Sequence, residues 1–143
     1  MVRPALFDAL AQVELILHAG DVGPDDVLLE LEAIAPVQAV SGNTDTPGNP
    51  RLLPELVLHI DGVSIHVSHG HELGSPTPAN LLAAYPHRVL VYGHTHRQQI
   101  HQAGDRLVIN PGAAGARRFD LQPSIALLTI EDGVPSSRLV TLN

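Results

Sequence analysis

The segment Val89-Leu90-Val91-Tyr92-Gly93-His94-Thr95-His96 carries the most informative pattern in the chain. Four apolar residues, mostly β-branched or aromatic, run into a glycine, and two histidines two positions apart follow at once. This order predicts a buried strand that ends at the glycine and presents both imidazoles where the chain leaves the sheet. Ligands of open α/β sheets bind just beyond the carboxyl ends of the strands, so we expect the chemistry of this protein there.

Three further apolar runs end in the same way, each with an Asp, Asn or His beside a glycine. They are Leu15–Asp21, Val37–Asn43 and Ile65–His71. Four strand-like segments that each deliver such a side chain predict a metal site assembled from strand ends. Its candidate ligands are Asp21, Asn43, His69 and His94.

Each of these residues has a simpler interpretation when it is taken alone. Asp21 is then a helix N-cap, Asn43 a turn residue and His69 a hydrogen-bonded loop histidine. Nine histidines in 143 residues also produce about 0.6 His-x-His pairs by chance, so one such pair is weak support. Two pairs, each at a strand end and beside a glycine, favour the joint interpretation as a metal site.

The composition bounds the class of protein. A chain of 143 residues predicts a single domain over residues 1–143. Its net charge of −7 argues against a general nucleic-acid or acidic-membrane surface, because phosphate groups would be repelled. The absence of cysteine excludes disulfides and thiolate metal sites, and no apolar run approaches the roughly 18 residues of a membrane span. We therefore expect a cytoplasmic protein with no membrane or nucleic-acid partner.

The hydrophobic pattern predicts alternating strands and helices in the first half of the chain and antiparallel strands in the second. The expected helices cover Pro4–Val13, Pro24–Ile34 and Pro76–Tyr85. The expected strands cover Leu15–His18, Gln38–Ser41, Leu56–Ile60, Val63–Ser68, Arg88–Tyr92, Gln98–Gln102, Arg106–Asn110, Ser124–Ile130 and Arg138–Leu142. Asp61-Gly62 is the strongest hairpin signal, and Gly42–Pro54 is expected to be a loop without a core element. Two sheets packed face to face with helices outside would accommodate both halves.

The candidate donor atoms indicate the kind of metal. One carboxylate, one amide oxygen and two imidazoles suit Mn²⁺, Zn²⁺, Fe or Ni²⁺ better than Ca²⁺ or Mg²⁺ alone. His96, two residues beyond His94, could reach a second ion while Asp21 bridges both. Two ions about 3.5–4 Å apart clamp a phosphoryl group and activate a water for in-line attack. The donor set is therefore compatible with phosphoester hydrolysis.

A family resemblance rests on the same blocks. The series Gly20-Asp21, Gly42-Asn43, His69-Gly70-His71 and Gly93-His94-Thr95-His96 resembles the calcineurin-like metallophosphoesterases. In particular it resembles the small bacterial and archaeal phosphodiesterases of the YfcE/MJ0936 type, whose fold is shared by the retromer subunit Vps29. The segment Asn110-Pro111-Gly112-Ala113 resembles the Asn-Pro-Gly-Ser segment of that subfamily, and the match extends over essentially the whole chain.

The resemblance implies an α/β fold, built as a four-layer α/β/β/α sandwich of two mixed sheets. It also implies hydrolysis of a small phosphodiester or phosphomonoester by metal-activated water. By position, Asp21 resembles the bridging ligand, Asn43, His69 and His94 complete one metal site, and His96 serves the other. Two ions are bound in the family, and Mn²⁺ is the expected cofactor, with Zn²⁺, Ni²⁺ or Fe as alternatives.

The sequence also suggests catalytic and substrate-binding residues. His71 and Asn43 are the expected catalytic residues, and His71 is the candidate proton donor because Thr44 stands where larger members of the superfamily carry a histidine. Arg117 and Arg118 form the only paired cation in the chain. They could hold a phosphate bidentately, or they could be two solvated surface arginines.

One departure from the family pattern concerns the beginning of the sequence. The family opens with a strand that ends in Asp-x-His, whereas this sequence begins where the first helix of the family begins. We expect that first strand to be missing, through a truncated or mis-started sequence or, as a second choice, a degenerate protein. One metal site would then be complete while the other retains only Asp21 and His96, and the open sheet edge would favour a homodimer formed by strand pairing.

Two functions from different classes remain open. The leading hypothesis is a metal-dependent phosphodiesterase that acts on a small phosphoester. The alternative is a catalytically silent scaffold of the Vps29 kind, which binds a partner through an apolar surface. Retention of every visible ligand favours the enzyme, because a scaffold has no need of them. A metal-storage or sensor module has no support beyond the histidines.

Overall fold

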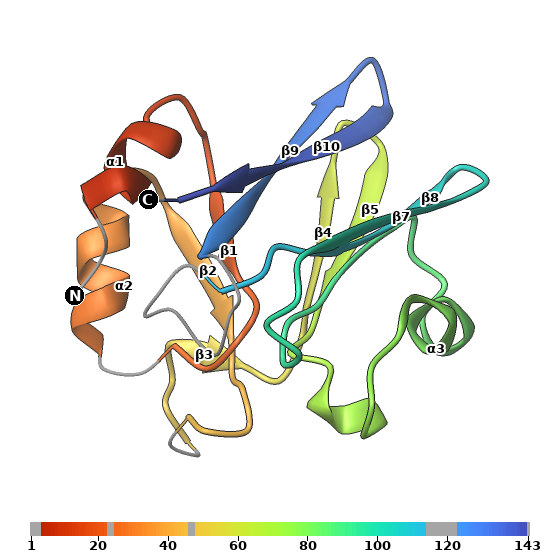
Figure 1. Cartoon of the computed structure of the whole chain (residues 1–143), viewed down its shortest axis with the longest axis horizontal. Helices are drawn as coiled ribbons and strands as arrows, with labels where there is room; N and C mark the ends of the chain where they lie inside the picture. Colours follow the sequence, from red (N-terminus) through yellow and green to blue (C-terminus); the bar gives the residue numbers. More distant parts are fainter. Residues whose placement is uncertain (1–3, 23–24, 46–47, 114–122, 143) are drawn as a thin grey trace.

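The computed structural model describes residues 4–22, 25–45, 48–113 and 123–142 and confirms the expected mixed α/β fold (Figure 1). The helices are α1 (Pro4–Ala9), α2 (Asp25–Glu32), the 3-10 helix η1 (His71–Leu73) and α3 (Pro78–Ala84). The strands are β1 (Ile16–His18), β2 (Val37–Val40), β3 (Leu52–Leu53), β4 (Leu56–Ile60), β5 (Val63–Val67), β6 (Val89–Val91), β7 (Gln99–Ala103), β8 (Arg106–Asn110), β9 (Ser124–Glu131) and β10 (Val134–Thr141). No helix within these ranges is long and apolar enough to cross a membrane.

Two main sheets organise the molecule. The larger has five strands in the order β4-β5-β6-β8-β7, in which β5, β6 and β8 run parallel and the two edge strands run antiparallel. The smaller has three parallel strands in the order β1-β2-β3. Strands β9 and β10 form a separate antiparallel hairpin. The strands that carry the predicted ligands are thus parallel within each sheet, so their carboxyl ends share an edge.

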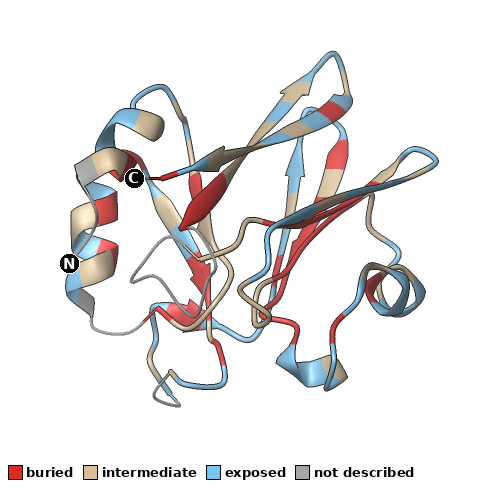
Figure 2. Ribbon diagram, viewed as in Figure 1, coloured by how far each residue is buried: buried red, intermediate tan, exposed pale blue. Residues whose placement is uncertain are grey.

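The central strand β6 is buried on both faces, as its unbroken apolar sequence predicts. Val89 and Val91 pack in one cluster with Val40 of β2, so they face the smaller sheet. Leu90 packs in a different cluster with Leu81, the fully buried residue of α3. Figure 2 shows this concentration of buried residues along the middle strands of the larger sheet. The core therefore fixes the distance between the two sheets and hence between their strand ends.

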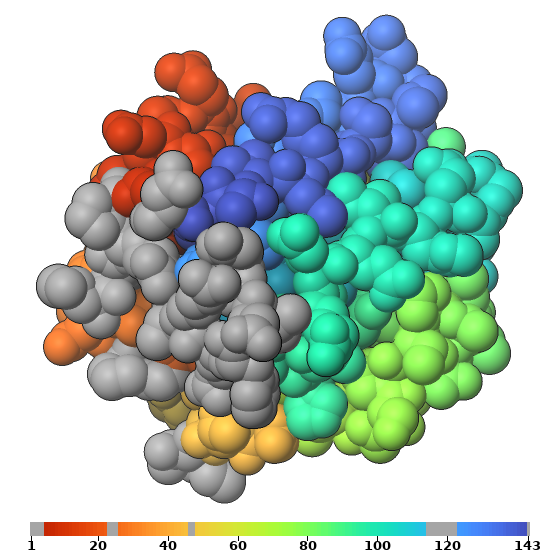
Figure 3. All heavy atoms as spheres, in the orientation of Figure 1, coloured from red at the N-terminus to blue at the C-terminus, as the bar shows by residue number. Residues whose placement is uncertain are grey.

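The smaller sheet is covered on its other face by the two N-terminal helices. Leu6 of α1 and Leu31 of α2 pack with Ile16 of β1 in a cluster that also includes Ile125 and Leu142 from the C-terminal part of the chain. Figure 3 shows the resulting proximity of α1 (red) and the β9–β10 hairpin (blue) on one face of the molecule. Helix α3 lies on the opposite side, against the larger sheet (Figure 1).

Both Asp-Gly pairs form tight hairpin turns. Asp61 and Gly62 have φ values of 49° and 79°, and Asp132 and Gly133 have φ values of 52° and 75°. Positive φ at both central residues is the signature of a type I′ turn, whose twist matches that of the flanking strands. The two turns also contact each other, because the Gly133 N–H donates to Asp61 Oδ2 at 3.1 Å.

The largest departures from the sequence-based expectation concern β3, β10 and α1. The expected loop Gly42–Pro54 contains strand β3, which pairs with β2 and buries Leu52 in the core, so that expectation was wrong. Strand β10 begins at Val134 rather than Arg138, because its full length pairs with β9. Helix α1 ends at Ala9 rather than near Val13, where turns close the chain instead.

The β3 finding leads to a stability prediction with a matched control in the neighbouring residue. Leu52 is 8% exposed and Leu53 is 47% exposed. We expect Leu52→Ala to lower the free energy of unfolding by about 2–5 kcal/mol, since it leaves a cavity in the core. Leu53→Ala should change it by about 0.5 kcal/mol or less. Urea unfolding of both variants tests this, and equal effects would show that β3 does not pack as described.

Candidate metal centre

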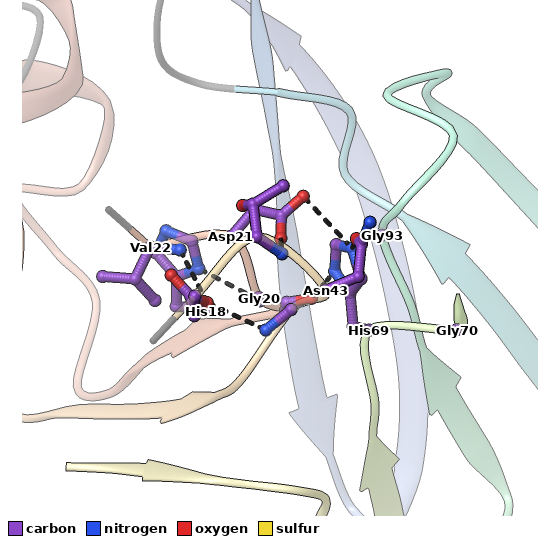
Figure 4. A network of polar contacts seen from close by, with 12 residues as sticks. His18, Gly20, Asp21, Val22, Asn43, His69, Gly70 and Gly93 are labelled. Atoms are coloured by element: carbon purple, nitrogen blue, oxygen red, sulfur yellow. Dashed lines mark hydrogen bonds and ion pairs between the residues drawn. The ribbon is translucent and has the colours of Figure 1, made fainter. Parts of the chain in front are cut away.

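The predicted ligands follow the carboxyl ends of four strands. Figure 4 shows three of them, Asp21, Asn43 and His69, side by side. Asp21 follows β1 and Asn43 follows β2 in the smaller sheet, while His69 follows β5 and His94 follows β6 in the larger one. Exposure increases outward from His69, which is 2% exposed, through the partly exposed Asp21 and His94 to the exposed Asn43. The site thus has a buried base and an open mouth.

His69 is held in one orientation by the backbone of the smaller sheet. Its Nδ1 lies 2.8 Å from the carbonyl oxygen of Ala19, which can only accept a hydrogen bond. The proton of a neutral imidazole is therefore on Nδ1, and Nε2 carries a free electron pair. Gly20 makes this approach possible, since a Cβ at that position would stand 2.4 Å from Nδ1.

The free Nε2 faces two further electron-pair donors. It lies 3.0 Å from Asn43 Oδ1 and 3.2 Å from Asp21 Oδ2. When the His69 proton is on Nδ1 and the Asn43 amide points its oxygen at His69, no hydrogen atom lies between these three electron-pair donors. A cation would bind all three. Ligand atoms about 2.1 Å from one ion and at right angles to each other are about 3.0 Å apart. The residues present therefore fit a divalent transition metal.

Asp21 is kept ionised by its surroundings. Burial would raise the pKa of its carboxyl group, but the hydrogen bonds from Thr44, with smaller contributions from the nearby His69 and His96 side chains, outweigh burial and lower the pKa below its usual value. The Thr44 N–H donates to Oδ1 at 3.0 Å, which leaves Oδ2 directed at His69. Gly42 is required at this contact, because a Cβ there would stand 2.1 Å from Asp21 Oδ1.

Three candidate ligands have backbone conformations that L-residues rarely adopt. The φ values of Asp21, His94 and His96 are 53°, 68° and 61°. Such strain costs on the order of 1–3 kcal/mol per residue and concentrates at functional sites. The His94 ring stands edge-on to that of His69 with 5.1 Å between ring centroids. Among the described residues, no group of three His, Cys, Asp or Glu side chains lies close enough together to hold an ion. The candidate centre therefore depends on Asn43 as a ligand.

The remaining predicted site residues are only partly placed. His71 is exposed, and its ring centroid lies 5.2 Å from that of His69 and 6.3 Å from that of His94. His71 therefore stands at the mouth of the site. Arg117 and Arg118 lie outside the described residues.

Two polar side chains that position the ligand loops were missed at the sequence level. Asp45 Oδ2 accepts from the N–H groups of Val22 and Gly42, at 3.0 and 2.8 Å, and so ties the Asp21 loop to the Asn43 loop. Asn110 is fully buried, and its amide donates to Thr95 Oγ1 at 2.9 Å, inside the histidine loop. The resemblance to the family singled out the Asn110 segment but assigned it no contact.

A second polar cluster adjoins the metal centre beside His71. Glu72 accepts from the Gly70 N–H at 3.0 Å and from the Tyr85 hydroxyl at 2.8 Å. Burial raises the pKa of Glu72, but the hydrogen bonds, first of all that of Tyr85, outweigh it and lower the pKa below the usual value. Burial and the Glu72 carboxylate together raise the pKa of Tyr85 to about 12.

The sequence profile of the calcineurin-like phosphoesterase superfamily domain matches residues 2–133. Together with the α/β fold and the polar side chains at its strand ends, this match shows that the chain belongs to the calcineurin-like phosphoesterase superfamily. The resemblance inferred from the motifs is thereby confirmed.

Individual relatives agree with this assignment. A probable metallophosphoesterase of Methanothermobacter thermautotrophicus is 35% identical over 133 residues, which cover 91% of this chain and 77% of the relative. Phosphodiesterase MJ0936 of Methanocaldococcus jannaschii is 29% identical over 132 residues, which cover 83% of this chain and 78% of the relative. The structure of Entamoeba histolytica Vps29 complexed with zinc has a TM-score of 0.79 at 24% identity and covers 100% of this chain and 91% of that one. The names of the relatives support a phosphoesterase function, and the Vps29 match shows a shared fold.

The Glu72–Tyr85 hydrogen bond leads to a titration prediction. The chain has only two tyrosines, so Tyr85 titrates alone in a Tyr92→Phe background. The pKa of Tyr85 is raised to about 12, so the stability that its neutral phenol contributes is complete below pH 10 and is lost as the pH rises through 12. We expect Glu72→Gln to lower the pKa of Tyr85 but to leave it above 10, because burial remains.

Tyrosinate absorbance measures this pKa, and circular dichroism shows whether the chain is still folded at each pH. Glu131→Gln is the control, because it removes the same charge from an exposed residue on β9 that does not contact Tyr85. An unchanged titration in Glu72→Gln would contradict the hydrogen bond.

Proposed function

We propose that this protein is a metal-dependent phosphodiesterase that hydrolyses a small phosphodiester or phosphomonoester. The observation that carries the proposal is the convergence of three electron-pair donors, Asp21 Oδ2, Asn43 Oδ1 and His69 Nε2, at the joined strand ends of two sheets. Membership of the calcineurin-like phosphoesterase superfamily and the names of the relatives support this class of reaction.

Asp21, Asn43 and His69 would hold the ion, and His94 and His96 would add imidazole ligands from the neighbouring loop. The mixed oxygen and nitrogen donors favour Mn²⁺, with Zn²⁺, Ni²⁺ or Fe as alternatives. When bound, such an ion polarises a phosphoryl oxygen and lowers the pKa of water. The chain would hold the ligand atoms in place. For His69 the Ala19 carbonyl does this, because its hydrogen bond to Nδ1 fixes the orientation of the ring.

The more exposed residues would handle the substrate. Asn43 is exposed and stands between the ion site and solvent, so its amide would also contact the phosphoryl group. His71 lies at the mouth, where its imidazole would donate a proton to the departing alcohol. Arg117 and Arg118 are proposed to bind the phosphate.

The proposal predicts the effect of removing the buried imidazole. His69→Gln should reduce Mn²⁺ affinity and kcat/KM for bis-para-nitrophenyl phosphate by about 10–100-fold or more. Replacing a residue that only hydrogen-bonds to a metal ligand already reduces affinity or activity by about this factor, and His69 would be a ligand itself. Isothermal titration with Mn²⁺ and the release of nitrophenolate measure the two quantities. Asp21→Asn should behave in the same way, and circular dichroism shows whether either variant is misfolded.

His101→Gln is the matched control, because this histidine is exposed on β7 and belongs to none of the contacts described above. It should leave both quantities unchanged. A wild-type protein that binds no metal and hydrolyses no phosphoester would favour the Vps29-like scaffold. Metal binding that survives both His69→Gln and Asp21→Asn would show that the ion lies elsewhere.

A further inference from the structure

An open pocket of about 370 Å³ lies directly beside the candidate metal centre. Its lining includes Ser41 and Ser68, which precede Asn43 and His69 by two and one positions, and it includes His71 at the mouth of the centre. The rest of the polar lining comes from Glu55, Glu72 and Tyr85. A ligand with one group at the metal centre therefore has room for a second group in this pocket.

The pocket has a negative charge, and no arginine or lysine among the described residues lines it to balance that charge. Glu55 and Glu72 both line it, and the chain contains no lysine at all. Glu72 is an ionised carboxylate, because its hydrogen bonds lower its pKa. Glu55 Oε2 lies 2.6 Å from Nε2 of the buried His66, so the carboxylate is anchored at one oxygen. A positively charged group is therefore favoured in this pocket.

The hydrogen-bonding groups of Glu72 and Tyr85 also favour a ligand that donates hydrogen bonds. Glu72 Oε1 accepts from the Gly70 N–H and Oε2 accepts from the Tyr85 hydroxyl, and a carboxylate oxygen can accept two hydrogen bonds. The Tyr85 hydroxyl spends its proton on Glu72, so its oxygen can only accept. These groups have spare electron pairs and no spare protons.

Ser68 adds an observation that does not depend on the carboxylates. Its side chain is 1% exposed and lines the pocket, and its Oγ makes no hydrogen bond of acceptable distance and angle within the described residues, although it lies near Glu72 and Tyr85. A buried hydroxyl without a partner is unfavourable. A polar ligand group would satisfy it.

Stacking and hydrogen bonds hold two of the lining side chains, Tyr85 and Glu72, in position. The Tyr85 ring stacks on His66 with 4.0 Å between the centroids, and the Arg106 guanidinium donates to the Tyr85 carbonyl. Glu72 is fixed at both oxygens by Gly70 and Tyr85. Preorganised groups lose little freedom when a ligand binds, so their contacts contribute more to affinity.

We propose that this pocket binds a short alcohol substituent of the substrate that carries an ammonium group, so that the protein prefers zwitterionic phosphoesters of aminoalcohols. The phosphate would lie at the metal centre and the ammonium group would donate to Glu72, Glu55 and Ser68. This inference rests on the proposed function, because it takes the metal centre as the phosphate site.

Binding tests the proposal without turnover. Isothermal titration compares 2-aminoethyl phosphate with propyl phosphate, which replaces the ammonium group by a methyl group of similar size. We expect the wild-type protein, loaded with Mn²⁺, to bind the ammonium ligand about tenfold more tightly. Glu72→Gln and Glu55→Gln should each reduce this ratio, and the double variant should bring it close to one. Glu131→Gln should leave it unchanged.

Kinetics separate this inference from the proposed function. The substrates are 2-aminoethyl 4-nitrophenyl phosphate and propyl 4-nitrophenyl phosphate, which release the same nitrophenolate. Preference for the ammonium substrate that is lost in Glu72→Gln supports the inference. Hydrolysis of both at equal rates, or equal or undetectable binding of the two ligands, overturns it. Selective binding without hydrolysis of either substrate supports the pocket and contradicts the phosphodiesterase proposal instead.

Discussion

The hydrogen bond from His69 Nδ1 to the Ala19 carbonyl is the contact on which the site depends. It joins the end of β5 in the larger sheet to the end of β1 in the smaller one. The Gly93 N–H donates to the His69 carbonyl at 3.0 Å, which adds the end of β6. One buried histidine is thus connected to three strand ends. Without the proton on Nδ1, its Nε2 would not present an electron pair to Asp21 and Asn43.

The close approach of the two sheets demands small residues and costs backbone strain. Gly20 and Gly42 stand where any Cβ would collide with His69 and Asp21. Asp21, His94 and His96 adopt left-handed conformations that only surrounding structure can maintain. Asp45 and Asn110 supply that support through hydrogen bonds between neighbouring loops, and the packed core between the sheets prevents them from relaxing apart.

Local sequence patterns predict the elements that short-range preferences determine, and they fail where distant residues decide. Strands β5, β6 and β8 and the Asp61-Gly62 turn are confirmed, because unbroken apolar runs and Asp-Gly pairs have few alternative structures. Strand β3 was missed, since two residues in a loop rich in Gly and Pro become a strand only by pairing with β2. The Glu72 pocket was missed for the same reason: its lining comes from segments at or beside β2, β4, β5, η1 and α3, which no spacing rule connects.

Charge balance explains why the proposed ligand set suits a phosphoester. Among the three converging donors only Asp21 is charged, while Asn43 and the Nδ1-protonated His69 are neutral. A divalent cation held by these donors would keep a net positive charge, whereas a ligand set made only of carboxylates would cancel the charge of the ion. In a protein with a net charge of −7, that local positive charge is what would attract an anionic phosphoester. Glu55 and Glu72 line the adjacent pocket together with His71, so the phosphate and the ammonium group of the proposed substrate would meet charges of opposite sign.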